Sequence, residues 1–156
     1  MRVSVVVPVY RGELTLEALI AEIVPLAEPT PTPAGTRFAV CEIVLVHDGA
    51  VDGSARVIKS LAAKHPMVLP LWLSRNFGQH AATLAGMAST TGDWVVTLDE
   101  DGQHNPREIA ALLDAAIASG SISRGSPSRG KRVLRAAPGL ERFRKASTRV
   151  RAAGMM

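Results

Sequence analysis

The sequence contains a single cysteine, Cys41, among its 156 residues. One cysteine excludes an internal disulfide and any zinc or iron–sulfur site built from several cysteines. We interpret Cys41 as a small buried hydrophobe beside a strand. The sequence also lacks an apolar run of the roughly 18 to 20 residues that a membrane-spanning helix needs. We therefore expect the chain as given to be cytosolic and to carry no membrane anchor of its own.

Two common nucleotide-binding fingerprints are also absent. The chain has neither a phosphate-cradling loop that ends in Gly-Lys-Ser/Thr nor a Gly-x-Gly-x-x-Gly dinucleotide motif, which argues against an ATPase and a nicotinamide-dependent dehydrogenase. Of its residues, 47% are apolar and 21% are charged. This composition can form a packed core and argues against a disordered or fibrous chain. The length predicts one domain.

Acidic and basic residues are distributed unevenly. Residues 1–120 hold eight Lys and Arg against thirteen acids, whereas residues 121–156 hold ten Lys and Arg against one acid. The high isoelectric point therefore belongs to the C-terminal segment. An inference of nucleic-acid binding from the total charge would depend on the C-terminal segment rather than on the predicted domain. We therefore expect no nucleic-acid partner.

Residues 1–120 alternate β-branched apolar runs with segments of helical periodicity. This alternation is typical of a mainly parallel sheet covered by crossover helices, an α/β three-layer sandwich of the Rossmann-like kind. The predicted strands are Val3–Val9, Glu42–Val46, Val68–Leu73 and Trp94–Leu98. The predicted helices are Leu14–Val24, Asp52–Lys64, Asn76–Ser89 and Pro106–Ser119.

Two segments depart from this alternation. Glu28–Gly35 holds three prolines in five residues, which predicts a stiff surface loop because proline lacks a backbone donor. After Gly120, Ser, Arg, Gly and Pro dominate, and we expect no further strand. We predict a folded domain over residues 1–120 and a disordered basic tail over 121–156, with Glu141–Ala152 able to form a short basic helix.

Three consecutive carboxylates, Asp99, Glu100 and Asp101, follow the predicted strand Trp94–Leu98. Ligands of parallel sheets bind beyond the carboxyl ends of the strands. In extended backbone Asp99 and Asp101 point to the same side, so both can reach one hard cation such as Mg²⁺ or Mn²⁺. Such ions bridge diphosphate oxygens. The alternative is an acidic loop that caps the following helix.

Two other strand ends also carry polar residues. His47 and Asp48 follow the second strand; the Asp48 carboxylate can accept hydrogen bonds from a base or ribose, and we expect Asp52 to cap the next helix. With no nucleophile beside it, His47 is interpreted as a spacer or a nucleotide contact. Arg75, in the junction after the third strand, can pair with phosphate or with the acidic cluster, whereas His80 is as readily a surface or packing residue as a ligand.

Together these segments resemble family 2 glycosyltransferases of the GT-A fold, and most closely the polyprenyl-phosphate sugar transferases among them. The resemblance covers residues 3 to about 119, in four segments that occur in the family's order. They are Val5–Tyr10, Glu42–Gly49, Ser74–Gly86 and Gly92–Pro106.

The resemblance implies transfer of a sugar from a UDP- or GDP-linked donor to a polyprenyl phosphate, with inversion and with Mg²⁺ or Mn²⁺. It implies that the nucleotide contacts are Pro8, Tyr10, Val46 and Asp48. It also implies that the diphosphate and its metal are held by Asp99, Glu100, Asp101 and Gln103, with Asp99 and Asp101 as the metal ligands. It assigns no catalytic base, since the acceptor phosphate is already anionic.

The chain also differs from the family pattern. His47-Asp48 stands where two adjacent aspartates are usual, and Arg11-Gly12 stands where the family has Asn-Glu. We expect such differences to change donor preference or binding strength. Glu13 is a candidate substitute for the missing glutamate.

The resemblance ends near Gly120, where family members continue with the acceptor site. We interpret this as a truncated or frame-shifted product that holds only the N-terminal nucleotide-binding half. The alternatives are a native basic tail that contacts anionic lipid at the inner face of the cell membrane, and a noncatalytic nucleotide-binding or interaction module whose basic tail binds lipid or nucleic acid. A nucleotidyltransferase of similar topology is disfavoured, because the chain contains both the Ser74–Ala82 segment and the Asp99–Pro106 segment.

Overall fold

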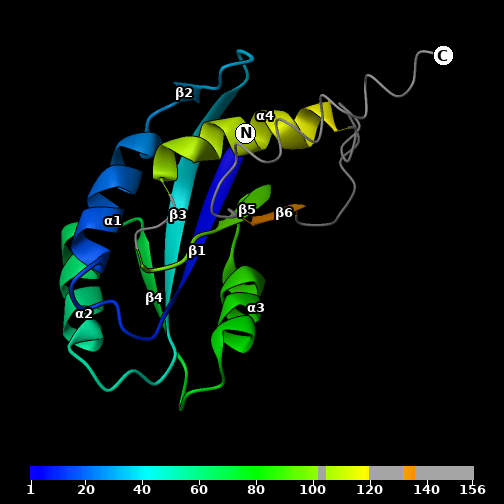
Figure 1. The fold of residues 1–156 in the computed structure, drawn as a ribbon. Helices are drawn as coiled ribbons and strands as arrows, with labels where there is room; N and C mark the ends of the chain where they lie inside the picture. The colour runs from blue at the N-terminus through cyan, green and yellow to red at the C-terminus, as the bar shows by residue number, and fades with distance from the viewer. Residues whose placement is uncertain (102–104, 120–131, 136–156) are drawn as a thin grey trace.

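The computed structural model of the chain describes residues 1–101, 105–119 and 132–135. In these residues a six-stranded sheet lies between two layers of helices (Figure 1). The strands are β1 (Arg2–Val9), β2 (Thr30–Pro31), β3 (Arg37–His47), β4 (Val68–Trp72), β5 (Trp94–Thr97) and β6 (Arg132–Arg135). The helices are α1 (Leu16–Ile23), α2 (Ser54–Lys64), α3 (Gln79–Ser89) and α4 (Ile109–Ala118), with 3₁₀ turns η1 (Val24–Ala27) and η2 (Pro106–Glu108). The predicted α/β three-layer sandwich is confirmed.

Strand β1 lies inside the sheet and pairs in parallel with β3 on one side and β5 on the other. The chain first adds β3 and β4 on one side of β1, and later adds β5 and β6 on the opposite side. In an open parallel sheet, ligands bind beyond the carboxyl ends of the strands where the strand order reverses. The topology therefore points to the ends of β1 and β5.

The alternation of side chains along the strands divides the core between the two faces of the sheet. The larger core lies under α1, α2 and α4, and includes Val5, Val7, Ile43, Leu45, Leu16, Ile58 and Leu113. The smaller core lies under α3 and consists of Val6, Val44, Val46, Ala82 and Val95, with Leu71, Leu73 and Met87 packed against it. Burial of both faces explains why the strands read as continuous apolar runs.

Helix α3 lies close to the sheet because it presents small residues to it. Ala82 is fully buried, and a Cβ atom at Gly86 would collide with a methyl group of Val6 and lie 2.8 Å from one of Val46. No side chain therefore fits at position 86 without moving the helix.

The second strand is longer than the sequence analysis predicts. Strand β3 begins at Arg37, five residues earlier, because its first residues pair antiparallel with β2 and Phe38 and Val40 are buried. The proline-rich segment is a loop at the sheet edge, apart from the two residues of β2. Its Thr32 hydroxyl and Ala34 N–H both donate to the Asp114 carboxylate of α4, at 2.6 and 2.8 Å. This contact ties the loop to α4.

One expectation about the C-terminal segment requires correction. The sequence analysis expects no strand after Gly120, but Arg132–Arg135 forms β6 and pairs in parallel with β5. Backbone pairing along β5, rather than a long apolar run, accounts for this strand. The rest of the predicted basic tail, including the possible helix at Glu141–Ala152, lies outside the described residues.

A polar network occupies the sheet on the α3 side, at the end opposite the strand carboxyl ends. The buried Glu42 carboxylate accepts hydrogen bonds from the Ser4 hydroxyl (2.6 Å), from the Thr91 N–H and hydroxyl, and from the Gly92 N–H (3.3 Å). Burial alone would raise the pKa of Glu42, but the hydrogen bonds from Ser4, Thr91 and Gly92 outweigh it and lower the pKa. Glu42 therefore joins β1, β3 and the turn before β5.

We expect Glu42→Gln to lower the free energy of unfolding by about 1–2 kcal/mol at pH 7, because the charge-assisted hydrogen bonds become neutral ones. The folded-state pKa lies below the ordinary value of 4.5, so the ionised carboxylate adds stability above that pH. This contribution is lost as the pH falls through the folded-state pKa. Urea unfolding between pH 7 and 3 should therefore show the two proteins converging in acid, and a constant difference would contradict this account.

Candidate functional site

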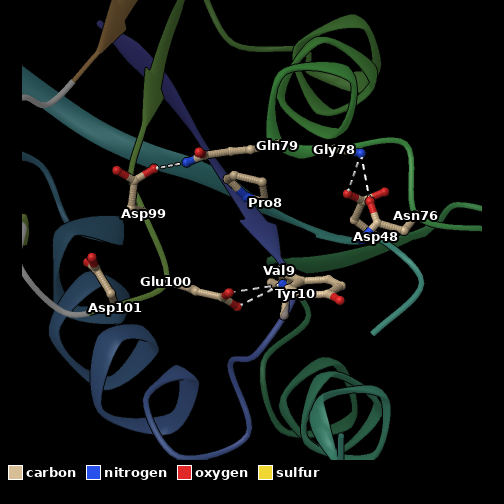
Figure 2. A pocket seen from close by; sticks show the side chains of 10 residues that line it. All are labelled: Pro8, Val9, Tyr10, Asp48, Asn76, Gly78, Gln79, Asp99, Glu100 and Asp101. Atoms are coloured by element: carbon tan, nitrogen blue, oxygen red, sulfur yellow. Dashed lines mark hydrogen bonds between the residues drawn. The ribbon is translucent and has the colours of Figure 1, made fainter. Parts of the chain in front are cut away.

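A cavity of about 410 Å³ opens where the topology indicates, beyond the carboxyl ends of β1, β3 and β5. Its size lies within the range of small-molecule sites. The lining residues come from the ends of β1, β3 and β5 and from the junction before α3 (Figure 2). They are Pro8, Val9, Tyr10, Asp48, Asn76, Gly78, Gln79, Asp99, Glu100 and Asp101.

The three carboxylates after β5 have different surroundings. The Glu100 carboxylate accepts from the N–H groups of Tyr10 (3.0 Å) and Arg11 (2.8 Å), which joins the end of β5 to the end of β1. Asp99 Oδ1 accepts from Gln79 Nε2 at 2.6 Å, and Asp101 is exposed at the cavity. In Figure 2 the Glu100 side chain points to the Tyr10 backbone, away from the carboxylates of Asp99 and Asp101.

Burial raises the pKa of Glu100 above its ordinary value. The N–H groups of Arg11 and Tyr10 act in the opposite direction, while the charges of Asp52 and Asp101 add to the increase. Negative charge is therefore costly at this end of the sheet, where several carboxylates gather.

Asp48 holds the loop between β4 and α3. Its carboxylate is 3% exposed and accepts from the N–H groups of Phe77 (2.7 Å) and Gly78 (2.9 Å). The Asn76 side chain also accepts from the Gly78 N–H, at 2.8 Å. Because Gly78 adopts φ 89°, α3 begins at Gln79 rather than at Asn76 as predicted. This start places Gln79 beside Asp99.

The loops after β1 and β3 are joined to each other by reciprocal hydrogen bonds. The Gly12 N–H donates to the Ser54 hydroxyl, and the Gly53 N–H donates to the Glu13 carboxylate, both at 2.9 Å. Glu13 also pairs with Arg56 at 3.2 Å. Glu13 therefore supports the loop that leads into α2, and it does not line the cavity.

Asp52 lies one residue before Gly53, the N-cap of α2, so it is not the cap that the sequence predicts, although its carboxylate contacts the first helical residue. Its Oδ1 accepts from the Ser54 N–H at 3.1 Å and from the Ser54 hydroxyl at 2.5 Å. Burial would raise the pKa of Asp52, but these hydrogen bonds and a longer one from the Glu13 N–H lower it.

His47, Arg75 and His80 do not line the cavity. The His47 ring packs against Trp72 with ring centroids 5.1 Å apart, and its Nε2 has no hydrogen-bond partner in the described structure. This supports the spacer interpretation of His47. The Arg75 guanidinium lies over the Phe77 ring at 4.8 Å, and His80 is exposed on the first turn of α3.

Six of the eight ligand-contact residues expected from the sequence line this one cavity: Pro8, Tyr10, Asp48, Asp99, Glu100 and Asp101. Val46 does not, because it is fully buried between the sheet and α3; this corrects the expectation that it touches a nucleotide. Gln103 lies outside the described residues.

Four lining residues were not among the expected contacts: Val9, Asn76, Gly78 and Gln79. Three of them belong to the junction before α3, where the sequence places an amide and a glycine at a strand-to-helix boundary. An amide and a glycine at such a boundary could have marked the junction as part of the site. Its position in the fold, however, depends on its contact with Asp48.

The oxygen donors of Asp99 and Asp101 fit a divalent cation. Carboxylate oxygens are the ligands that Mg²⁺ and Mn²⁺ prefer. Within residues 1–101, 105–119 and 132–135, no three His, Cys, Asp or Glu side chains are grouped as a complete protein-made metal site. Mg²⁺ held by one or two carboxylates together with substrate phosphates needs no third protein ligand. The pair therefore suits an ion shared with a diphosphate.

None of the helices in the described segments is long and apolar enough to span a bilayer.

The sequence model of the family described as "Glycosyl transferase family 2" matches residues 4–147. Curated relatives are similar over about three quarters of the chain. An undecaprenyl-phosphate 4-deoxy-4-formamido-L-arabinose transferase from Aeromonas hydrophila is 40% identical over 117 residues, which is 74% of this chain and 33% of the relative. The protein of that name from Pseudomonas aeruginosa is 43% identical over 115 residues, 73% of this chain and 32% of the relative. The chain thus spans about a third of the length of these relatives.

Solved structures share the fold. TarS residues 1–349 of S. aureus in complex with UDP-GlcNAc superposes with a TM-score of 0.56 at 20% identity, covering 76% of this chain and 32% of that one. The mannosyltransferase PcManGT of Pyrobaculum calidifontis in complex with GDP-Man and Mn²⁺ gives 0.55 at 24% identity, covering 72% and 31%. Both likenesses concern the arrangement of helices and strands.

Proposed function

Because this chain belongs to glycosyl transferase family 2, we propose that it binds a nucleotide-diphospho-sugar for transfer of the sugar to a polyprenyl phosphate. The curated relatives act on undecaprenyl phosphate by name and are about 40% identical to this chain. The described residues supply the donor side of such a reaction.

The observation that carries this proposal is the cavity at the strand-order reversal. Polar and carboxylate groups line it beyond the ends of β1, β3 and β5. The lining includes apolar and aromatic surface, at Pro8 and Tyr10, and carboxylates, at Asp99 and Asp101. A nucleotide needs both kinds of surface, since the flat faces of its base stack on apolar or aromatic groups and its diphosphate requires charge neutralisation.

We assign the residues of the cavity as follows. Pro8, Tyr10 and Asp48 contact the nucleoside; an ionised carboxylate has about four acceptor positions, so Asp48 can hold its loop and still accept from a base or ribose. Asp99 and Asp101 hold Mg²⁺ or Mn²⁺ with the diphosphate. Glu100 positions Tyr10 by accepting hydrogen bonds from the backbone N–H groups of Tyr10 and Arg11.

The reaction implied is an inverting displacement. An oxygen of the acceptor phosphate attacks the anomeric carbon from the side opposite the nucleoside diphosphate, which leaves with the bonding electron pair. When bound, the divalent cation neutralises charge that develops on the departing diphosphate. Because the acceptor oxygen is already anionic, the chain needs no strong general base for this step.

The test is a calorimetric titration of the chain with UDP and with GDP, each with and without Mg²⁺ or Mn²⁺. We expect the metal to strengthen binding of one of the two nucleotides. We expect Asp101→Asn to weaken the metal-dependent binding at least tenfold, since changing even the outer-shell partners of metal ligands has effects on that scale. Asp93→Asn is the matched control, since Asp93 is an exposed acid outside the cavity lining. Equal binding heats with and without metal would contradict the metal assignment.

Sugar transfer is assayed separately with sugar-labelled donor and a polyprenyl phosphate in detergent. Lipid-linked sugar supports transfer by this chain. Nucleotide binding without lipid-linked product would instead assign the chain to donor binding alone.

A further inference from the structure

Large apolar side chains are exposed mainly at the end of the sheet that carries the cavity. Seven such residues are exposed in the described structure, and five of them lie at the end of β4 or on loops that follow β1, β3 and β4: Tyr10, Leu14, Val51, Trp72 and Phe77. Leu14 and Val51 are 92% and 89% exposed. Figure 1 shows these three loops gathered at one end of the ribbon. Exposed apolar groups gathered in one place mark an interaction surface.

Each exposed aromatic ring at this end is accompanied by a cation. The Arg11 guanidinium lies 5.6 Å from the Tyr10 ring centroid and the Arg75 guanidinium 4.8 Å from that of Phe77. The Lys59 ammonium lies 5.6 Å from the Trp72 ring. Aromatic rings paired with Lys or Arg suit the boundary between water and anionic headgroups, where each ring keeps one polar and one apolar neighbour.

The acids on these loops keep their negative charge, but each accepts hydrogen bonds within the protein. Glu13 pairs with Arg56 and accepts from the Gly53 N–H, and Asp52 accepts from Ser54. Asp99 and Asp101 face the cavity and suit a cation. Leu14 and Val51 adjoin Glu13 and Asp52, which are hydrogen-bonded across the first two loops, and both side chains stay exposed in the described structure.

We propose that this surface, called here the aromatic–basic edge, contacts an anionic lipid bilayer. It consists of Tyr10, Leu14, Val51, Trp72 and Phe77 with Arg11, Lys59 and Arg75. Leu14 and Val51 insert among the headgroups, the rings lie at the interface, and the cations meet lipid phosphates. The proposed bilayer contact is supported by these side chains alone. Its consequence is that a lipid-borne acceptor phosphate meets the cavity at the bilayer surface, and this consequence rests on the proposed function.

The test measures binding of the full chain to vesicles of phosphatidylcholine, with and without phosphatidylglycerol. We expect Leu14→Ser with Val51→Ser to lower binding about tenfold or more, from the apolar surface lost at the interface. We expect Lys59→Glu to lower binding to the anionic vesicles at least fivefold, the scale for one cation near a charged bilayer. Residues 121–156 are the same in every protein, so any lipid contact of theirs cancels in the comparison.

Two matched controls change residues away from the edge. Leu84→Ser changes a residue of α3 that is 64% exposed, and Lys64→Glu changes the last residue of α2, at the opposite end from the loops. Both should bind vesicles like the unchanged chain. An equal loss of binding in the controls, or equal binding of all variants, overturns the proposal.

Two further measurements distinguish bilayer contact from self-association and from nucleotide binding. If the double variant changes from dimer to monomer in sedimentation velocity and its vesicle binding is unchanged, the edge binds a second copy of the chain and the proposal fails. Nucleotide titration of the double variant separates the two proposals, because Leu14 and Val51 do not line the cavity. Retained nucleotide binding with lost vesicle binding supports the aromatic–basic edge.

Discussion

Replacing Asp48 with alanine is expected to lower nucleotide affinity on the order of 10- to 100-fold. The carboxylate accepts from the N–H groups of Phe77 and Gly78, and hydrogen bonds to a charged group contribute about 1.5–3 kcal/mol each. Without them the loop before α3 loses its anchor, and Asn76 and Gln79 lose their defined places in the cavity. About 1.4 kcal/mol corresponds to a tenfold change in binding.

Two measurements separate this effect from loss of folding. Hydrogen exchange at the Phe77 and Gly78 amides should accelerate in Asp48→Ala, while exchange in the core strands β1 and β3 stays slow. Asp48→Asn keeps the shape of the side chain and one acceptor oxygen, so we expect an intermediate loss. If Asp48→Ala bound nucleotide as well as the unchanged chain, with the loop amides still protected, Asp48 would have no role in holding the cavity.

Replacing Gly49 with alanine is expected to destabilise the fold by about 2–4 kcal/mol and to weaken nucleotide binding as well. Gly49 adopts φ 64°, and an added Cβ would lie 2.5 Å from the backbone nitrogen of Asn76 and 2.7 Å from the carbonyl carbon of Arg75. Backbone atoms cannot rotate away as a side chain can. The loop before α3 must therefore shift from the end of β3.

Gly35→Ala is the matched control for this substitution. Gly35 also has a positive φ, 85°, but an added Cβ there has no atom within 4 Å. It should cost only the backbone strain, about 1–2 kcal/mol, and leave nucleotide binding unchanged. Urea unfolding and calorimetry of both variants measure the two effects. Equal stability losses with equal binding would show that the contact between the Gly49 turn and the Asn76 loop is unimportant.

Much of the fold is predictable from local sequence. The continuous apolar run at Val3–Val9 and the helical spacing in 54–64 indicate buried parallel strands and crossover helices, because both faces of such a sheet are covered. The length of β3 and the strand β6 were not predicted, since they depend on pairing with β2 and β5. Pairing between distant segments leaves little trace in the hydrophobic pattern of either segment.

The candidate site was predictable in its members more than in its geometry. The acids after β5 were identified from their position at a strand end, Pro8 and Tyr10 from the family resemblance, and the structure brings them to one cavity. The inward direction of Glu100, and the core position of Val46, were not. The register of neighbouring strands sets where each strand ends relative to the next. That position decides which backbone N–H groups lie within hydrogen-bonding distance of a carboxylate.

The order of apolar runs, helices and polar strand ends, set by side-chain chemistry and spacing along the chain, determined an α/β sheet with an acidic ligand site and a likeness to one enzyme family. Only the tertiary structure decided that Asp48 secures the loop before α3, that Glu100 joins β5 to β1, and that exposed rings and cations lie at the end of the sheet that carries the cavity. These features require residues up to 90 positions apart in the sequence to lie within hydrogen-bonding distance. Strand pairing and helix packing place them there, and no local pattern encodes that distance.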